Sequence, residues 1–179
     1  MDKAKIARGV GLILDGIGAD RTNRNYKDTP RRVAKMYHEL FTPTRKRITS
    51  FPETHDSMIV LRGHTAYAVC PHHLLPVELT VYIGYIPQDR VLGLSKLARI
   101  AEAVLTEPIM QETYTDRVCD ALNDATDARG ASVIVTGTHG CMRARGVHTR
   151  ADVVTSARRG IFLTNPSTQE EFMRIIGHV

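Results

Sequence analysis

The chain has 179 residues, a length that fits one compact domain or one domain with an arm. Its content of 42% hydrophobic and 24% charged residues is typical of a globular protein, and no apolar run is long enough to cross a bilayer, which excludes a membrane span and a membrane partner. The formal net charge of +5 suits an anionic ligand, either a nucleotide or a nucleic acid.

Two helices are predicted at the start of the chain. A stripe of apolar residues recurs there at helical spacing and comprises Ile6, Val10, Ile13, Leu14 and Ile17. After a polar loop over residues 19–28, Asp28 stands where the cap of a second helix belongs, two residues before Pro30. The buried stripe of this second helix would comprise Val33, Met36, Tyr37 and Leu40. We therefore predict an N-terminal helical arm over residues 1–45 and a larger domain over residues 46–179.

Two antiparallel strands are predicted between residues 57 and 87. In the second of them Leu79, Val81 and Ile83 alternate with more polar residues, as in a strand with one buried face. The segment from Cys70 to Pro76 interrupts the pair, because its two prolines cannot donate hydrogen bonds to a ladder.

A pair of helices follows. Ser95 is predicted to cap the first, whose apolar face carries Leu97, Ile100, Ala101, Val104 and Leu105. The face of the second carries Tyr114, Val118, Ala121, Leu122 and Ala125. A strand leading to Cys141, a last strand around residues 153–155 and a short helix with Phe172, Ile175 and Ile176 complete an α+β pattern.

Three cysteines, an odd number, argue against a disulfide framework and favour a reducing compartment. The N-terminal residues lack the apolar block and cleavage site of a signal peptide, so we expect a cytoplasmic protein. Cys119 lies in a helical pattern beside Val118 and is predicted to pack as a small hydrophobe. The other two cysteines need another explanation.

Cysteines and histidines gather in two places far apart in the chain. Cys70, His72 and His73 lie close together, and His139 and Cys141 follow a later strand. Thiolates and imidazoles in such a set favour zinc. Because the separation of the two places is too long for a zinc finger, we expect tertiary folding to assemble the site.

Two kinds of zinc site remain compatible with this spacing. If zinc is held by Cys70, His73 and Cys141, a fourth coordination position is left for water, and His72 and His139 are free for proton transfer. The alternative is a closed structural site that uses four of these five residues.

Five segments resemble motifs of the GTP cyclohydrolase I family, in the same order along the chain. They are Asp28–Tyr37, Cys70–His73, Gly93–Arg99, Gln111–Glu112 and His139–Gly146. The resemblance covers roughly residues 28–176. It implies the tunnelling fold, in which antiparallel strand pairs and helix pairs of several subunits close into a barrel. It also implies a homo-oligomer, typically a decamer, with active sites between subunits.

The resemblance assigns roles at the metal site. Cys70, His73 and Cys141 match the family's zinc ligands, and His72 and His139 match its catalytic histidines. The implied reaction hydrolyses GTP to formate and 7,8-dihydroneopterin triphosphate, a first step toward pterins, folate or 7-deazaguanine. Zinc-bound water would attack C8 of the purine, and His139 is the expected acid for N7.

Substrate-binding residues are implied in the same way. Glu112 matches the carboxylate that accepts from two donors of guanine, and Gln111 beside it is also expected in the substrate site. Ser95 matches a residue near the ribose. The triphosphate would be held by Lys96, Arg99, Arg145 and, from a neighbouring subunit, Arg32. Without the resemblance, Glu112 is better explained by the dipole of a helix start, Ser95 by capping and the cations by a solvated surface.

Two other functions compete with this one. A related tunnelling-fold activity, the nitrile reductase of 7-deazaguanine synthesis, needs a nucleophilic cysteine outside a metal site, and Cys119 is a poor candidate for it. A nucleic-acid-binding module with a structural zinc would use the cluster of Arg143, Arg145, Arg150, Arg158 and Arg159. That module leaves Glu112 and the free histidines unexplained, so we expect GTP and not nucleic acid as the partner.

Overall fold

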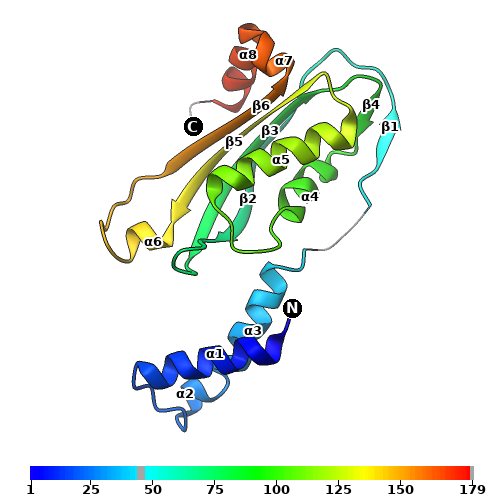
Figure 1. Cartoon of the computed structure of the whole chain (residues 1–179). Helices are drawn as coiled ribbons and strands as arrows, with labels where there is room; N and C mark the ends of the chain where they lie inside the picture. Colours follow the sequence, from blue (N-terminus) through cyan, green and yellow to red (C-terminus); the bar gives the residue numbers. More distant parts are fainter. Residues whose placement is uncertain (44–46, 178–179) are drawn as a thin grey trace. The chain divides into compact units, whose positions relative to one another are not determined.

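The computed structural model describes residues 1–43 and 47–177, and the chain divides into two compact units, Met1–Pro43 and Thr44–Val179 (Figure 1). The boundary predicted between residues 45 and 46 lies outside the described residues. Over the part of the chain that is described, no helix has both the length and the apolar character needed to span a membrane.

The first unit consists of helices α1 (Lys3–Gly16), α2 (Arg24–Lys27) and α3 (Thr29–Leu40). The side chain of Asp2 caps α1 by accepting from the backbone N–H of Lys5 at 2.8 Å. Gly18, with φ of +75°, ends the helix in the left-handed conformation that glycine adopts readily. The two long helices are as predicted, whereas α2 replaces part of the expected polar loop.

The buried stripes predicted for these helices are only partly correct. In α1 the buried residues are Gly11 and Leu14, while Ile13 is 62% and Ile17 73% exposed. In α3 the buried residue is Ala34, and Met36 is 44% exposed. Two long helices that pack on each other bury only one narrow strip of each, so the remaining apolar residues stay at the surface.

The cap predicted for α3 is also only partly correct. Asp28 occupies the cap position, but its side chain makes no capping hydrogen bond. The carboxylate instead lies 3.8 Å from the guanidinium of Arg31, one turn along the helix.

The second unit is built on a four-stranded antiparallel sheet in the order β2 (Ile59–Val69), β3 (Pro76–Ile86), β5 (Gly130–His139) and β6 (Val153–Gly160). Between its two strand pairs the chain forms helices α4 (Ser95–Ala103) and α5 (Gln111–Thr126). The predicted α+β class is therefore confirmed, with the strand pairs and the intervening helix pair expected of a tunnelling fold. The small sheet of β1 (Ser50–Pro52) and β4 (Arg90–Leu92) was not expected.

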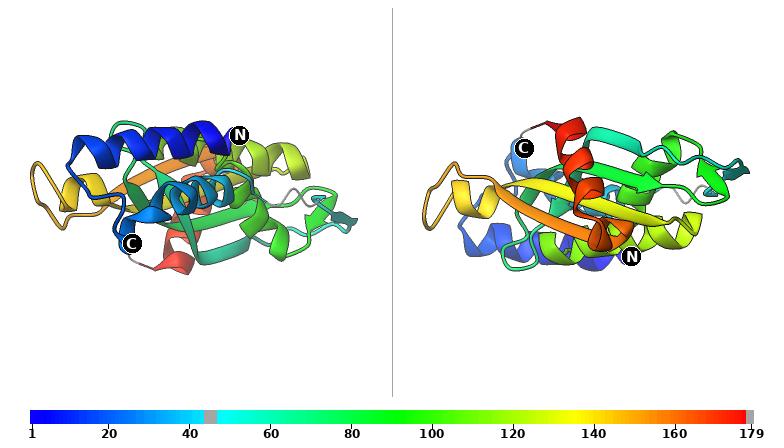
Figure 2. Two further views of the ribbon diagram at one scale, coloured as in Figure 1. Left: turned by 90° about the horizontal axis from the view of Figure 1, so that it is seen from below. Right: turned by 90° about the horizontal axis from the view of Figure 1, so that it is seen from above.

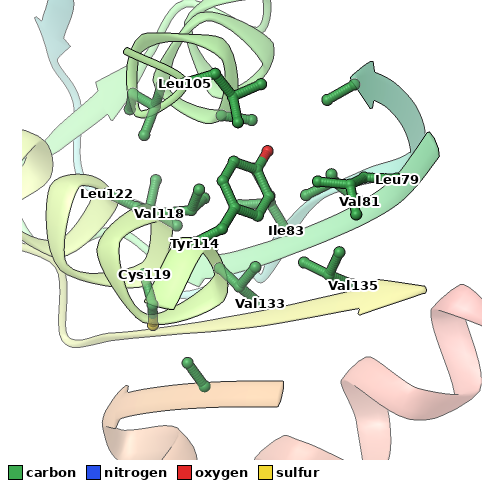
Figure 3. Close-up of a cluster of buried hydrophobic side chains, with 14 of the residues drawn as sticks. Leu79, Val81, Ile83, Leu105, Tyr114, Val118, Cys119, Leu122, Val133 and Val135 are labelled. Atoms are coloured by element: carbon green, nitrogen blue, oxygen red, sulfur yellow. The ribbon is translucent and has the colours of Figure 1, made fainter. Parts of the chain in front are cut away.

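One face of the sheet forms the main core with α4 and α5. Every second residue of β3 from Val77 to Tyr85 is buried on this side, as the alternating pattern predicts. Figure 3 shows residues of α5 packed against these strand residues, with Tyr114, Val118 and Leu122 facing Leu79, Val81 and Ile83. Ser95 is the first residue of α4 and Leu94 occupies the cap position, so the prediction of Ser95 as the cap is wrong by one residue.

The opposite face carries a second, smaller core. After β6 come α7 (Ile161–Thr164) and α8 (Pro166–Ile176), and α8 lies across the strands (Figure 2). This core comprises Ile86, Ile134, Phe162, Phe172 and Ile176. A Cβ atom on Gly84 of β3 would lie 2.6 Å from the ring of Phe172, so the absence of a side chain at Gly84 lets α8 approach the sheet.

Adding one methyl group at this contact is expected to destabilise the second unit. Gly84→Ala forces the buried ring of Phe172 to move, which costs about 1–3 kcal/mol and lowers Tm by roughly 2–10 °C. The matched control is Gly93→Ala, where the nearest atom to the new Cβ lies 3.6 Å away, an ordinary contact. Thermal melting at equal protein concentration checks the prediction. Equal Tm values for the two variants would contradict it.

Candidate metal centre

Four segments of the second unit meet at one end of the sheet. In the ladder Val69 of β2 pairs with Pro76 of β3, and Val77 pairs with His139 of β5. This register places the turn between β2 and β3 beside the end of β5. The N–H of Ile109, just before α5, donates to the carbonyl of Val69 at 3.1 Å, which brings the start of α5 to the same place.

The turn that carries Cys70 and His73 is closed by its own backbone. The N–H of Cys70 donates to the carbonyl of Leu75, and the N–H of Leu74 donates to that of Cys70, each at 2.9 Å. Leu74 adopts a φ of +53°, which is uncommon for a residue with a side chain. This tight turn holds Cys70, His72 and His73 together after the last residue of β2.

Cys141 reaches this turn from helix α6 (Gly140–Arg143), which directly follows β5. A Cβ atom on Gly140 would lie 2.9 Å from the carbonyl oxygen of Pro76. Glycine at this position therefore allows the start of α6 to pack closely against the start of β3. The close approach brings Cys141 beside Cys70.

The ligand atoms of Cys70, His73 and Cys141 all lie within 4.8 Å of one another. Zinc bonds of about 2.3 Å to sulfur and about 2.0 Å to nitrogen hold tetrahedral ligand atoms roughly 3.5–3.8 Å apart. Sγ of Cys70 and Nδ1 of His73 are 3.9 Å apart, close to that value. Two sulfurs and one imidazole at this spacing fit a zinc ion.

Within residues 1–43 and 47–177, no fourth cysteine, histidine or carboxylate joins this group. Nδ1 of His72 lies 4.0 Å from Sγ of Cys70, but His72 is not within reach of all three ligands. His139 is held elsewhere, because its Nε2 bonds to Oε1 of Gln111 at 2.7 Å. A group of three is the arrangement of a site with an open coordination position.

An open pocket adjoins the group and has about 650 Å³ of space, its mouth included. Cys70, His72, Cys141, Gln111, Glu112 and His139 are among its lining residues. The remaining wall is mostly apolar and comprises Ala68, Pro71, Val77, Leu79, Ile109, Met110, Met142 and Val153. An apolar pocket with a few convergent polar groups is typical of a small-molecule site.

Burial at the pocket shifts the pKa values of two of its residues, Cys141 and His139. Burial raises the pKa of the Cys141 thiol, and the neighbouring Cys70 adds to this, whereas Arg145 acts in the opposite direction. Burial lowers the pKa of His139, and the negative charge of Glu112 partly offsets that shift. His139 is thus predominantly neutral at neutral pH in the free chain, and the thiol of Cys141 needs a cation beside it to ionise.

The predicted substrate-binding residues lie in three places. Gln111 and Glu112 begin α5 and line the pocket, and Arg145 donates to Nε2 of His73 at 2.5 Å. By contrast, Ser95, Lys96 and Arg99 lie on α4 and do not line the pocket of the same chain. Arg32 belongs to the first unit.

Two of the five arginines that suggested nucleic-acid binding form ion pairs within the protein. Arg159 bonds to Asp120 at 2.7 Å and to Asp116 at 3.1 Å, and Arg143 bonds to Asp152 at 3.2 Å. These ion pairs neutralise part of the positive cluster, which weakens the case for a phosphate-backbone surface.

Cys119 is fully buried, as predicted for a packed hydrophobe, and burial raises the pKa of its thiol to about 12. A nucleophilic cysteine needs an accessible thiolate. Cys119 therefore cannot serve the nitrile reductase alternative.

Sequence reasoning missed three residues that support the site. Gly137, Thr115 and Thr155 surround Gln111, and both threonines belong to a partly buried hydrogen-bond network with it. No local sequence pattern identifies them, because they come together only when α5, β5 and β6 pack in the folded chain.

An α+β domain whose strand ends bring two cysteines and two histidines to an open pocket, with His73 beside the two sulfurs, is an enzyme fold with a candidate metal centre. The chain belongs to the GTP cyclohydrolase I family, whose model matches residues 6–177. It is 40% identical to GTP cyclohydrolase 1 of Carboxydothermus hydrogenoformans, covering 99% of this chain and 96% of that protein. It is also 40% identical to GTP cyclohydrolase 1 of Clostridium perfringens strain 13, covering 98% of each.

Among solved structures, the chain is similar in part to the apo form of the archaeosine synthase QueF-Like. The TM-score is 0.46 and the identity 16%, over 59% of this chain and 96% of the other.

Proposed function

We propose that the chain is a zinc-dependent GTP cyclohydrolase I that hydrolyses GTP to formate and 7,8-dihydroneopterin triphosphate. The observation that carries the proposal is the group of Cys70, His73 and Cys141 at an open pocket that also contains His72, His139 and Glu112. The names of the chain's relatives, which align with it over nearly its whole length, support the same activity.

Zinc would be held by Cys70, His73 and Cys141, and when bound it would supply the Lewis acidity that makes water a nucleophile near neutral pH. The ring of His139 would exchange a proton with the purine, and His72 lies on the same pocket wall for a second transfer. Both roles are implied by the family resemblance, and the position of the two imidazoles in the pocket wall supports them, because an imidazole that is not a ligand remains available for acid–base chemistry.

Glu112 would select guanine at the first turn of α5. Its exposed carboxylate lines the pocket and can accept from the N1–H and the exocyclic amine of guanine. Arg145, at the side of His73, would bind phosphate oxygens. The three unpaired cysteines support a reducing compartment, and we propose the cytoplasm.

The activity is tested by incubating the zinc-loaded protein with GTP and measuring formate release together with pterin fluorescence. We expect both products in equal amounts, and none from protein stripped of metal. Salt-sensitive binding of duplex DNA or RNA without turnover of GTP would instead favour the nucleic-acid-binding alternative.

We further propose that the active form is a homo-oligomer, with the decamer implied by the family resemblance as the expected state. Ser95, Lys96 and Arg99 do not line the pocket of their own chain, whereas Arg145 of the same unit bonds to His73. A triphosphate needs several cations, and a second copy of the chain would bring Arg32 and the residues of α4 to it.

Complementation between two inactive variants is the expected consequence of a shared site. Arg32→Ala removes a phosphate ligand that one copy would supply, and Cys141→Ser removes a metal ligand that the other copy would supply. When the two variants assemble at random in equal amounts, both residues are intact in about one quarter of the sites. Formate release from coexpressed and from separately purified variants provides the comparison. A monomer with full activity in light scattering would contradict the proposal.

A further inference from the structure

The side chain of Gln111 is committed to bonds within the protein, although the residue stands at the pocket. Gln111 is 5% exposed. Its Nε2 donates to the carbonyl of Val135 at 3.0 Å, to that of Val153 at 2.9 Å, and to Oγ1 of Thr155 at 3.1 Å. Its Oε1 accepts from the ring of His139. Helix α5 and strands β5 and β6 thus meet at this one amide, which has no donor left for a substrate.

The hydrogen-bond partners of the Gln111 side chain also determine the positions of its amide oxygen and nitrogen. Backbone carbonyls only accept hydrogen bonds, so the NH₂ group must face Val135 and Val153. The oxygen must then face His139. Turning the amide over would place its oxygen against the two carbonyl oxygens, and acceptors facing one another make an unfavourable contact.

Two threonines hold the first turn of α5 in this orientation. The hydroxyl of Thr115 donates to the carbonyl of Gln111 at 2.8 Å. Because that uses its single hydrogen, Thr155 donates to Thr115 in their contact of 2.6 Å. The chain of hydroxyls fastens β6 to the start of α5 and leaves Oγ1 of Thr155 as an acceptor for Gln111.

The amide orientation selects one form of the histidine ring. The amide oxygen of Gln111 has no hydrogen to donate, so Nε2 of His139 carries the proton of their 2.7 Å bond. In the neutral ring Nδ1 is then unprotonated. We propose that Gln111 is a positioning residue that holds His139 as its Nε2–H tautomer, which makes Nδ1 the atom that exchanges a proton with the substrate. This inference rests on the acid–base role proposed above for His139, and it replaces the predicted substrate-binding role of Gln111.

Gly137 provides the space for this hydrogen bond. It lies two residues before His139 on β5, and a Cβ atom there would overlap Oε1 of Gln111 and lie 3.1 Å from Nε2 of His139. Its backbone does not adopt a positive φ, so alanine is acceptable to the strand itself. Gly137→Ala therefore displaces the amide oxygen while both partners of the bond keep their side chains.

The test combines two variants and two measurements on zinc-loaded full-length protein. Gln111→Met keeps the size of the side chain and removes its acceptor, and Gly137→Ala displaces it. ¹⁵N NMR of the histidine rings at about pH 8, above the ordinary pKa of about 6.5, reports which nitrogen carries the proton. We expect Nε2–H for His139 in the unmodified protein and a mixture of tautomers in both variants. Steady-state kinetics should show kcat lowered by about 10- to 100-fold and KM for GTP changed by less than about twofold.

Gln169→Met is the matched control, because Gln169 lies on α8 and bonds to Ser132 at 3.0 Å without lining the pocket. It should leave the tautomer and kcat unchanged. An Nδ1–H signal for His139 in the unmodified protein, or an unaltered tautomer in both variants, would overturn the inference. A KM raised more than about tenfold at unchanged kcat would make Gln111 a substrate ligand instead. A changed tautomer with unchanged kcat would uphold the positioning role and refute the catalytic role of His139.

Discussion

Replacing Cys141 by serine is expected to remove the metal and to lower GTP turnover by at least about a thousandfold. Cys141 supplies one of the two sulfurs in the group of three ligands. A serine hydroxyl is a poor ligand for zinc, and losing a ligand costs more affinity than the 10- to 100-fold of losing an outer-shell partner. Without the metal the site loses the Lewis acidity that we propose for activating water near neutral pH.

The measurement is the metal content per chain, taken together with formate release. Cys119→Ala is the matched control, because Cys119 is fully buried and its Sγ lies 3.7 Å from the carbonyl of Ala131, remote from the pocket. That variant should retain its metal and lose only stability, by about 1 kcal/mol. One zinc per chain with normal turnover in Cys141→Ser would refute the proposed ligand set.

Glu112→Gln is expected to weaken GTP binding by at least about tenfold while the zinc content stays unchanged. The carboxylate can pair with two donors of guanine, whereas an amide offers only one oxygen and turns its NH₂ toward a donor. ATP presents an acceptor at N1, so the unmodified chain should discriminate against it. The variant should lose much of that preference.

Calorimetric titration with GTP and ATP decides whether Glu112 binds guanine or only interacts favourably with the start of α5. Glu107→Gln is a suitable control, because Glu107 lies just before α5 and pairs with Arg117 at 3.0 Å without lining the pocket. Its GTP affinity should equal that of the unmodified chain. If folded, zinc-loaded Glu112→Gln binds GTP equally well, Glu112 acts only through its favourable position at a helix start.

Much of the fold was predictable because it depends on local periodicity. The alternation in β3 correctly predicted which face is buried, and the helical spacing in α5 correctly predicted Tyr114 and Val118 as core residues. The same reasoning failed for Ile13 and Ile17, which are exposed in the first unit. Periodicity identifies an apolar face, but only packing decides how much of that face is covered.

The amino-acid types in the chain define the chemistry available to the site. Two sulfurs and several imidazoles in two clusters predicted zinc, and the motif resemblance predicted the family. Tertiary structure decided which groups meet. The pairing of Val77 with His139 and the close packing at Gly140 bring Cys141 to the turn of Cys70. Gln111 is buried in a network drawn from three elements, and Ser95 lies on a helix that does not line the pocket of its own chain. Strand register and hydrogen-bond direction are relations between distant segments, so no local pattern in the chain specifies them.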